Sequence, residues 1–220
     1  GTTGFYSVVG NTIWFSTNKG RVFKSLDKGL TWTVVSTPLV SACKIVFRDA
    51  NNGILYQTSN GATCETSDGG TTWTTYTPTG NFYTSDIAYV PGTPNTYVST
   101  AGSSASASYS LYGCHIWNDF TGVLGQMLAT TWVSNTCGWA GSFNTSATVG
   151  GMYKFTGSIP NPYNNDLGVL SVALPQDGLV LTSSENVQLT IMNYGLLAQS
   201  NFNVSYSING GTAVTELVSA

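Results

Sequence analysis

The strongest constraint on the fold of this 220-residue chain is an eight-residue motif that occurs twice. Residues 25–32 and 66–73 both fit the pattern Ser/Thr-x-Asp-x-Gly-x-Thr-Trp, with the second copy starting 41 residues after the first. The matching residues are Ser25, Asp27, Gly29, Thr31 and Trp32 in the first copy, and Thr66, Asp68, Gly70, Thr72 and Trp73 in the second. A repeat at this spacing indicates one structural unit used several times.

A third, degenerate copy spans residues 110–117, 44 residues further on. It keeps Ser110 and Trp117 but has Tyr112 in place of the aspartate and Cys114 in place of the glycine. Its position in the period is what makes the assignment credible.

The segments between the copies also repeat. Each contains two short β-rich runs joined by a polar turn, at residues 44–49 and 53–56 and again at residues 85–90 and 95–99. Residues 138–143 and 151–155 predict two more strands. A period of 41 to 44 residues with about four strands is the signature of a β-propeller blade. We therefore expect an all-β fold with about three to four blades in residues 1–157.

Residues 158–165 are rich in proline and asparagine and predict a linker. Beyond it, residues 166–220 contain no tryptophan and predict strands at 167–172, 187–192, 202–208 and 212–218, with a strong hairpin signal at Asn209-Gly210. An immunoglobulin-like β-sandwich needs roughly seven strands. We therefore expect an incomplete sandwich in residues 166–220. Three to four blades are too few for the usual closed ring, so we also expect the chain to be a piece of a longer polypeptide.

Charge is scarce. Only 8% of the residues are charged, against about 25% in an average globular domain, and the net charge is −3. Seven Lys and Arg are too few for a phosphate-binding surface, so a nucleic-acid partner is excluded. No stretch reaches the 18 or so apolar residues of a membrane span. The composition favours an extracellular β protein.

The two intact octapeptides resemble the Asp box, or BNR repeat, of sialidase-like propellers. The resemblance covers residues 1–157 and implies that each motif is a turn between the third and fourth strands of a blade. There the aspartate accepts backbone N–H groups, the glycine takes a positive φ and the tryptophan packs into the blade core.

The overall sequence pattern of residues 1–157 also resembles that of the photosystem II assembly-factor type of Asp-box propeller found in secreted bacterial proteins. Residues 166–218 resemble immunoglobulin-like modules of large cell-surface proteins of Bacteroidetes, many of which are exported by type IX secretion. These resemblances imply a secreted or cell-surface protein.

The four cysteines lack the close pairing of a zinc site, and there is one histidine, so we expect no metal and no cofactor. In an oxidising compartment, two bridges between near neighbours are favoured, Cys43–Cys64 and Cys114–Cys137. Four buried thiols are the alternative.

Catalytic candidates are few. A sialidase needs three arginines for its substrate carboxylate, and the chain has only Arg21 and Arg48. His115, in the degenerate motif, is expected at the surface, and as the only histidine it leaves no spare candidate for a triad. The acids outside the motifs and before the linker, which we expect to be structural, are Asp49, Glu65, Asp86 and Asp119. The tryptophans outside the intact motifs are Trp14, Trp117, Trp132 and Trp139. They could form a sugar-binding platform, but a tryptophan at a recurrent blade position is more often a core residue.

The sequence therefore favours a non-catalytic adhesion, binding or structural protein. Its partners would be a glycan, another surface protein, or further blades of the same or another chain. One alternative is a glycoside hydrolase of the Asp-box type whose catalytic blades lie outside these residues. A second is a subunit of an extracellular assembly or filament.

Overall fold

A computed structural model describes residues 4–123, 125–144, 146, 148, 150–160, 164–175, 184–193, 195 and 197–219. Within these residues the regular structure is entirely β. The chain divides into two compact units, Gly1–Asn161 and Pro162–Ala220, and the division falls inside the expected linker. Ile159 is fully buried in the first unit, so the first part of that segment belongs to it.

The first unit consists of four antiparallel sheets, each with its strands in chain order. Blade 1 contains β1 (Tyr6–Val9), β2 (Thr12–Ser16), β3 (Arg21–Ser25) and β4 (Thr33–Ser36). Blade 2 contains β5 (Cys43–Phe47), β6 (Gly53–Gln57), β7 (Thr63–Thr66) and β8 (Thr74–Tyr76). Blade 3 contains β9 (Asp86–Tyr89), β10 (Tyr97–Thr100), β11 (Ala107–Ser110) and β12 (Asn118–Asp119). Blade 4 has three strands, β13 (Ala129–Ser134), β14 (Cys137–Asn144) and β15 (Gly150–Lys154).

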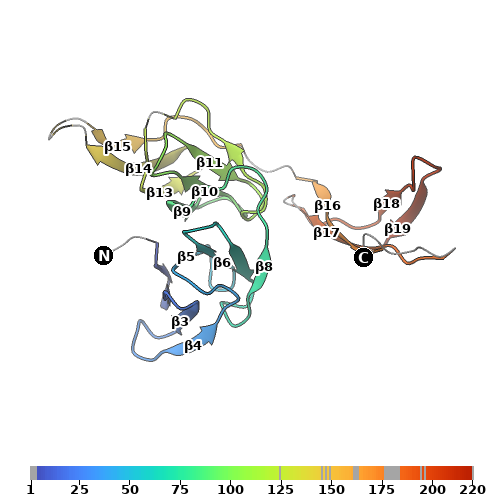
Figure 1. The fold of residues 1–220 in the computed structure, drawn as a ribbon, viewed down its shortest axis with the longest axis horizontal. Helices are drawn as coiled ribbons and strands as arrows, with labels where there is room; N and C mark the ends of the chain where they lie inside the picture. Colours follow the sequence, from blue (N-terminus) through green and yellow to red (C-terminus); the bar gives the residue numbers. More distant parts are fainter. Residues whose placement is uncertain are drawn as a thin grey trace. The chain divides into compact units, whose positions relative to one another are not determined.

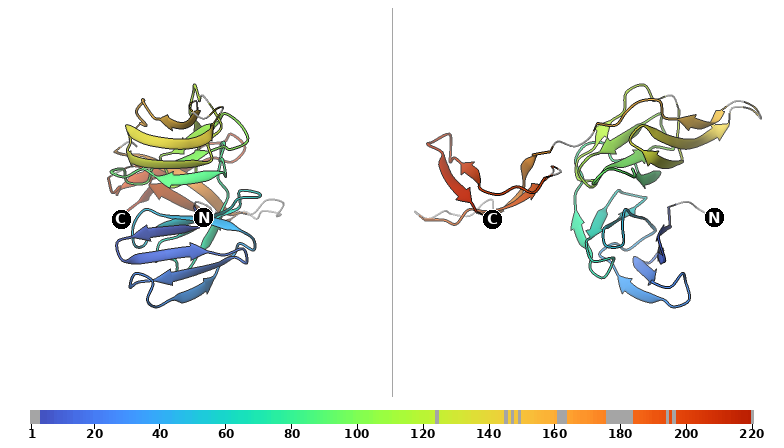
Figure 2. Two further views of the ribbon diagram at one scale, coloured as in Figure 1. Left: turned by 90° about the vertical axis from the view of Figure 1, so that its left-hand side faces the viewer. Right: turned by 180° about the vertical axis from the view of Figure 1, so that it is seen from behind.

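The first strands of successive blades lie next to one another: β1 contacts β5, β5 contacts β9, and β9 contacts β13. Figures 1 and 2 show the four sheets following one another from blue to yellow. This is the arrangement of a β-propeller, as the repeat predicted. Among the described strands, β13 makes no contact with β1, so the four blades form an open arc.

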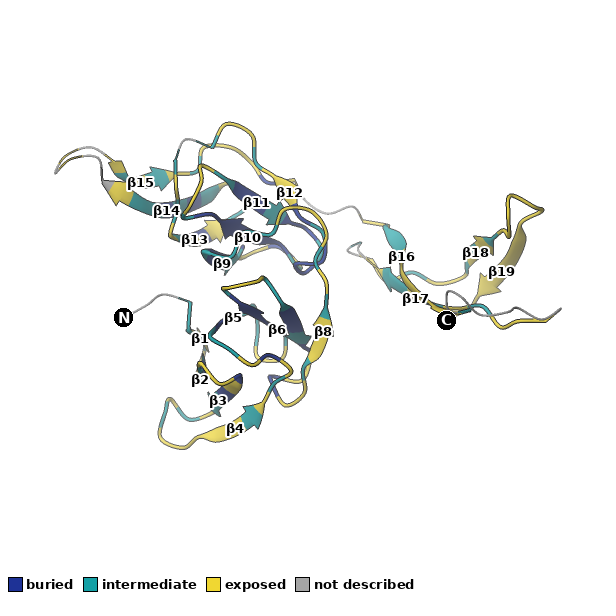
Figure 3. Ribbon diagram, in the orientation of Figure 1, coloured by how far each residue is buried: buried dark blue, intermediate teal, exposed yellow. Residues whose placement is uncertain are grey.

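The core lies between the blades and is made of three clusters. Trp14 anchors the cluster between blades 1 and 2, Tyr56 and Trp117 that between blades 2 and 3, and Trp132 that between blades 3 and 4. Every residue of β6 is buried, whereas β4 is mostly exposed (Figure 3). Blade 2 has a neighbour on each face, and so its first three strands are mostly buried, whereas β8 at its outer edge is mostly exposed.

The second unit contains two hairpins. β16 (Leu167–Leu174) pairs with β17 (Gln188–Asn193), and β18 (Phe202–Tyr206) pairs with β19 (Val214–Val218). Asn209 and Gly210 have φ values of 50° and 73°, as the predicted Asn-Gly hairpin turn requires. None of the described residues of this unit is buried. The hairpins agree with the expected strands, while an immunoglobulin-like sandwich stays a prediction.

Candidate functional site

The first octapeptide turn, residues 25–32, connects β3 to β4 and is held together by its own side chains. The Ser25 hydroxyl accepts the Gly29 N–H (2.8 Å) and donates to the Asp27 carboxylate (2.7 Å). Asp27 also accepts the backbone N–H (2.9 Å) and the hydroxyl (2.6 Å) of Thr31. The Trp32 indole donates to the Gly29 carbonyl (3.0 Å). These bonds, those from Thr31 above all, lower the pKa of Asp27 to about 2.

The second turn, residues 66–73, repeats this pattern between β7 and β8. The Thr66 hydroxyl accepts the Gly70 N–H (2.9 Å), and the Asp68 carboxylate accepts the Thr72 hydroxyl (2.6 Å). The Trp73 indole donates to the Gly70 carbonyl (3.2 Å). Hydrogen bonds from the Thr72 side chain and backbone hold the pKa of Asp68 well below its usual range.

The third turn, residues 110–117, keeps the same frame without the aspartate. The Ser110 hydroxyl accepts the Cys114 N–H (3.1 Å), and the Trp117 indole donates to the Cys114 carbonyl (2.9 Å). Cys114 has a φ of 72°, close to the 93° of Gly29 and the 87° of Gly70 at the same position. The serine and tryptophan that survive in the sequence are therefore the two residues that close the turn.

The turn tryptophans differ in burial. Trp117 is buried and stacks on Phe82 with ring centroids 5.1 Å apart, whereas Trp32 is 40% exposed. Trp32 packs edge-on against Phe15 (5.0 Å) on the side of blade 1 that faces away from blade 2. The expectation that Trp32 is a core residue is wrong here, because no described blade covers that side.

All four cysteines are free thiols in the structure, so neither expected bridge is formed in it. Cys43 and Cys64 lie in the cluster between blades 1 and 2, and burial raises the pKa of Cys43 to about 11 and that of Cys64 to about 12. Cys114 is fully buried between blades 2 and 3, and Cys137 lies in β14 of blade 4. Three of the four thiols are buried, whereas Cys137 is only partly buried.

Each of the four acids that lie outside the turns within residues 1–157 has polar partners. Asp49 accepts the N–H groups of Asn51 and Asn52 at 2.8 Å; burial opposes ionisation, but these bonds outweigh it and lower the pKa of Asp49. Asp119 accepts from Asn81 (2.7 Å) and Tyr83 (3.1 Å).

Asp86 and Lys44 form a buried ion pair at 3.2 Å, with both side chains 7% exposed. Lys44 belongs to β5 and also donates to the Ser85 carbonyl, while Asp86 begins β9 and accepts the Thr130 N–H of β13 at 2.9 Å. The pair thus ties together three of the four innermost strands.

Glu65 and His115 bond across blades 2 and 3, with 3.1 Å between Glu65 Oε2 and His115 Nε2. The expected surface position of His115 is wrong: its side chain is 7% exposed and stacks on Tyr76, with ring centroids 4.1 Å apart. A polar hollow of about 330 Å³ lies beside this contact, lined by Glu65, Arg48 and Tyr97 among others.

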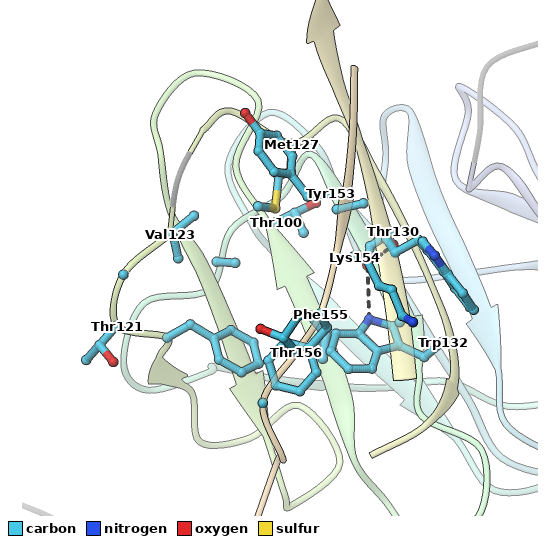
Figure 4. A pocket seen from close by; sticks show the side chains of 18 residues that line it. Thr100, Thr121, Val123, Met127, Thr130, Trp132, Tyr153, Lys154, Phe155 and Thr156 are labelled. Carbon is cyan, nitrogen blue, oxygen red and sulfur yellow. Dashed lines mark hydrogen bonds between the residues drawn. The ribbon is translucent and has the colours of Figure 1, made fainter. Parts of the chain in front are cut away.

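An aromatic cavity of about 330 Å³ lies between blades 3 and 4. Its walls include Phe120, Trp132, Tyr153 and Phe155, with Met127 beside Tyr153 (Figure 4). The Phe155 ring lies 4.9 Å from that of Trp132 and 5.5 Å from that of Phe120, and the Trp132 indole donates to Thr130 (2.9 Å). Among its lining residues only Lys154 is charged.

Of the four tryptophans weighed as a sugar platform, Trp14 and Trp117 are core residues. Trp132 belongs to the core between blades 3 and 4 and also lines this cavity, and Trp139 lines it as well. Phe120, Tyr153 and Phe155 were missed by sequence reasoning, since aromatic residues in short strands carry no local sign of which blade they face. Within the described residues no group of three His, Cys, Asp or Glu side chains is placed to hold a metal. No helix long and apolar enough for a membrane span occurs among them either.

No protein-family model and no curated protein matches the chain. Among solved structures, an ancestral GH74 enzyme has a TM-score of 0.51 at 16% identity, covering 70% of this chain and 23% of its own. The GH74 enzyme of Niastella koreensis has a TM-score of 0.49 at 17% identity, and the match covers 67% of this chain and 22% of that enzyme. YCF48 bound to D1 peptide has a TM-score of 0.46 at 16% identity, and the match covers 76% of this chain and 56% of YCF48. The chain thus spans less than two thirds of each, and the similarity shows the propeller fold alone.

Proposed function

We propose that this chain is a non-catalytic binding protein, secreted or on the cell surface, that uses the aromatic cavity between blades 3 and 4. We assign the three octapeptide turns to the Asp-box type and residues 166–220 to an immunoglobulin-like module. On this proposal, the type IX export suggested by the resemblance would deliver the chain to the outside. The observation that carries the proposal is the cavity itself.

The chemistry of its lining suits binding. Aromatic rings such as Tyr153 and Phe155 offer flat apolar surface, and threonine hydroxyls beside them offer hydrogen bonds that orient a ligand. Trp132 and Tyr153 lie in strands of blade 4, and Phe120 and Phe155 directly follow strands of blades 3 and 4, and so these walls are held in place before a ligand arrives. A glycan or a protein segment meets these requirements.

Binding of the full chain to a glycan array and to a peptide array tests the proposal. We expect saturable binding that Tyr153→Ala weakens at least about five-fold, as loss of an aromatic contact worth about 1 kcal/mol requires. Tyr6→Ala is the matched control, since Tyr6 is 62% exposed on blade 1. Turnover of a polysaccharide, abolished by changing one acid, would establish the glycoside hydrolase alternative and refute the proposal.

A second candidate, a subunit of an extracellular assembly, is favoured by the uncovered face of blade 1. Tyr6, Phe15, Phe23 and Val34 are cross-strand partners on this face, and Tyr6 and Val34 are 62% and 52% exposed. A blade or another chain would bury these side chains. Sedimentation at several concentrations tests this candidate, and a stable monomer of 23.2 kDa contradicts it.

A further inference from the structure

Blade 4 ends one strand short of the other three blades. Its sheet has the order β13-β14-β15, and no described strand pairs with the outer edge of β15. In blades 1, 2 and 3 the corresponding edge is paired with β4, β8 and β12, respectively, each antiparallel to its neighbour. An unpaired edge strand exposes backbone N–H and C=O groups that another strand can satisfy.

The sequence explains why no fourth strand of blade 4 occurs among the described residues. In blades 1 to 3 an octapeptide turn reverses the chain after the third strand, and residues 154–161 contain no such motif. Instead, the Ile159 N–H donates to the Asn135 carbonyl (2.8 Å), at the turn between β13 and β14. The chain therefore leaves β15 toward the inner strands of the blade, and its outer edge stays open.

The aromatic cavity lies beside this open strand. Tyr153 belongs to β15 and Phe155 follows it directly, and both line the cavity. Side chains alternate between the two faces of a strand, so every second residue of a strand added to β15 would point toward this side of blade 4. Blade 2 provides a precedent, since Tyr76 of its fourth strand packs into the cluster between blades 2 and 3.

The charge beside the cavity narrows the chemistry of the partner further. Lys154 is exposed at the end of β15 and is the one charged residue among those that line the cavity. Because Lys154 alternates with Tyr153 and Phe155 along the chain, its side chain points to the opposite face of the sheet, where a carboxylate on the neighbouring residue of an added strand would meet it.

We propose that the outer edge of β15 binds an extended peptide segment of a partner protein as an antiparallel fourth strand. An aromatic or large aliphatic side chain of the peptide enters the cavity, and a carboxylate faces Lys154. This inference rests on the proposed binding function and names its partner as a peptide strand, in the mode known as β-strand addition.

The probe is a capped synthetic peptide with the sequence of residues 31–37, which includes the fourth strand of blade 1 and its turn tryptophan. A second peptide carries glutamate in place of one threonine, and a scrambled peptide is the control. We expect the two unscrambled peptides to slow hydrogen exchange of residues 150–155 in the full chain, and the scrambled peptide to leave it unchanged. Thr121→Trp, which places a large side chain in the lining of the cavity, should weaken the binding of both unscrambled peptides.

Lys154→Glu should weaken binding of the glutamate peptide about two- to five-fold, as expected for an exposed ion pair. Lys19→Glu, at an exposed lysine in blade 1, is the matched charge control and should leave binding unchanged. Unchanged exchange at residues 150–155 with 1 mM peptide would overturn the inference. So would a dimer in which these amides are already protected without peptide. Glycan binding in the absence of peptide binding would leave the proposed function standing and refute this inference.

Discussion

At the scale of single residues, the octapeptide turns divide their tasks between side chains. The Ser or Thr hydroxyl and the tryptophan indole close all three turns, through bonds to the residue at the glycine position. The aspartate adds bonds to the threonine two residues beyond the glycine, and it does so only in the first two turns. This explains how the third turn forms with Tyr112 and Cys114, which break the sequence pattern.

The two turn aspartates predict a stability that depends on pH. The pKa of Asp27 is about 2 in the folded protein, while an unfolded aspartate has a pKa of about 3.9. The ionised form therefore favours the folded state: its contribution is present above about pH 4 and is lost as the pH falls through 2. The pKa of Asp68 is lowered in the same direction, and so it adds to the effect.

We expect the double variant Asp27→Asn, Asp68→Asn to have a lower Tm than the wild type at pH 5 and a smaller difference at pH 2.5. Thermal unfolding followed by circular dichroism measures this. Asp119→Asn, at an exposed acid in β12 outside the turns, is the control. Equal loss of Tm at both pH values would show that the turn carboxylates do not act through their ionisation.

At the scale of strands, an aromatic stack joins blade 1 to blade 2. Trp14 of β2 is fully buried, and its ring stacks on Phe47 of β5 with centroids 3.7 Å apart. Its indole also donates to the Gly69 carbonyl in the second octapeptide turn (2.9 Å). Trp14 therefore fixes blade 1 against both an inner strand and an outer turn of blade 2.

Trp14→Ala should lower the free energy of unfolding by about 3–5 kcal/mol, because it leaves a large cavity and an unpaired carbonyl. Urea denaturation measures the change. Trp32→Ala is the matched control on the same blade: it removes a 40% exposed ring and should cost only about 1 kcal/mol. A cost for Trp14→Ala no greater than that of the control would contradict the packing described here.

At the scale of the whole propeller unit, the buried Lys44–Asp86 pair joins strands of blades 2 and 3, and the bond from Thr130 adds blade 4. A buried charge that loses its partner is strongly destabilising, whereas a neutral pair can be tolerated. The pair is thus one polar contact that links three blades.

Lys44→Met should lower the free energy of unfolding by about 3–5 kcal/mol, because Asp86 is left buried without its cation. Adding Asp86→Asn should recover part of this loss, since the amide oxygen still accepts the Thr130 N–H. Lys19→Met controls for the loss of a positive charge. Urea denaturation of the wild type, Lys44→Met, Asp86→Asn and the double variant gives the coupling energy, and strict additivity of the two changes would argue against the pair.

The sequence by itself determined the repeating unit. Ser25, Asp27, Gly29 and Trp32 interact within eight residues, so their spacing predicts both the turn and the blade around it. The Asn209-Gly210 hairpin follows from local geometry in the same way. Only the tertiary structure decided which side chains meet across blades: the burial of His115, the Lys44–Asp86 pair, the aromatic cavity and the free edge of β15. These depend on contacts between residues from separate strands or blades, and nothing in the local spacing of a short strand records which neighbour it will face.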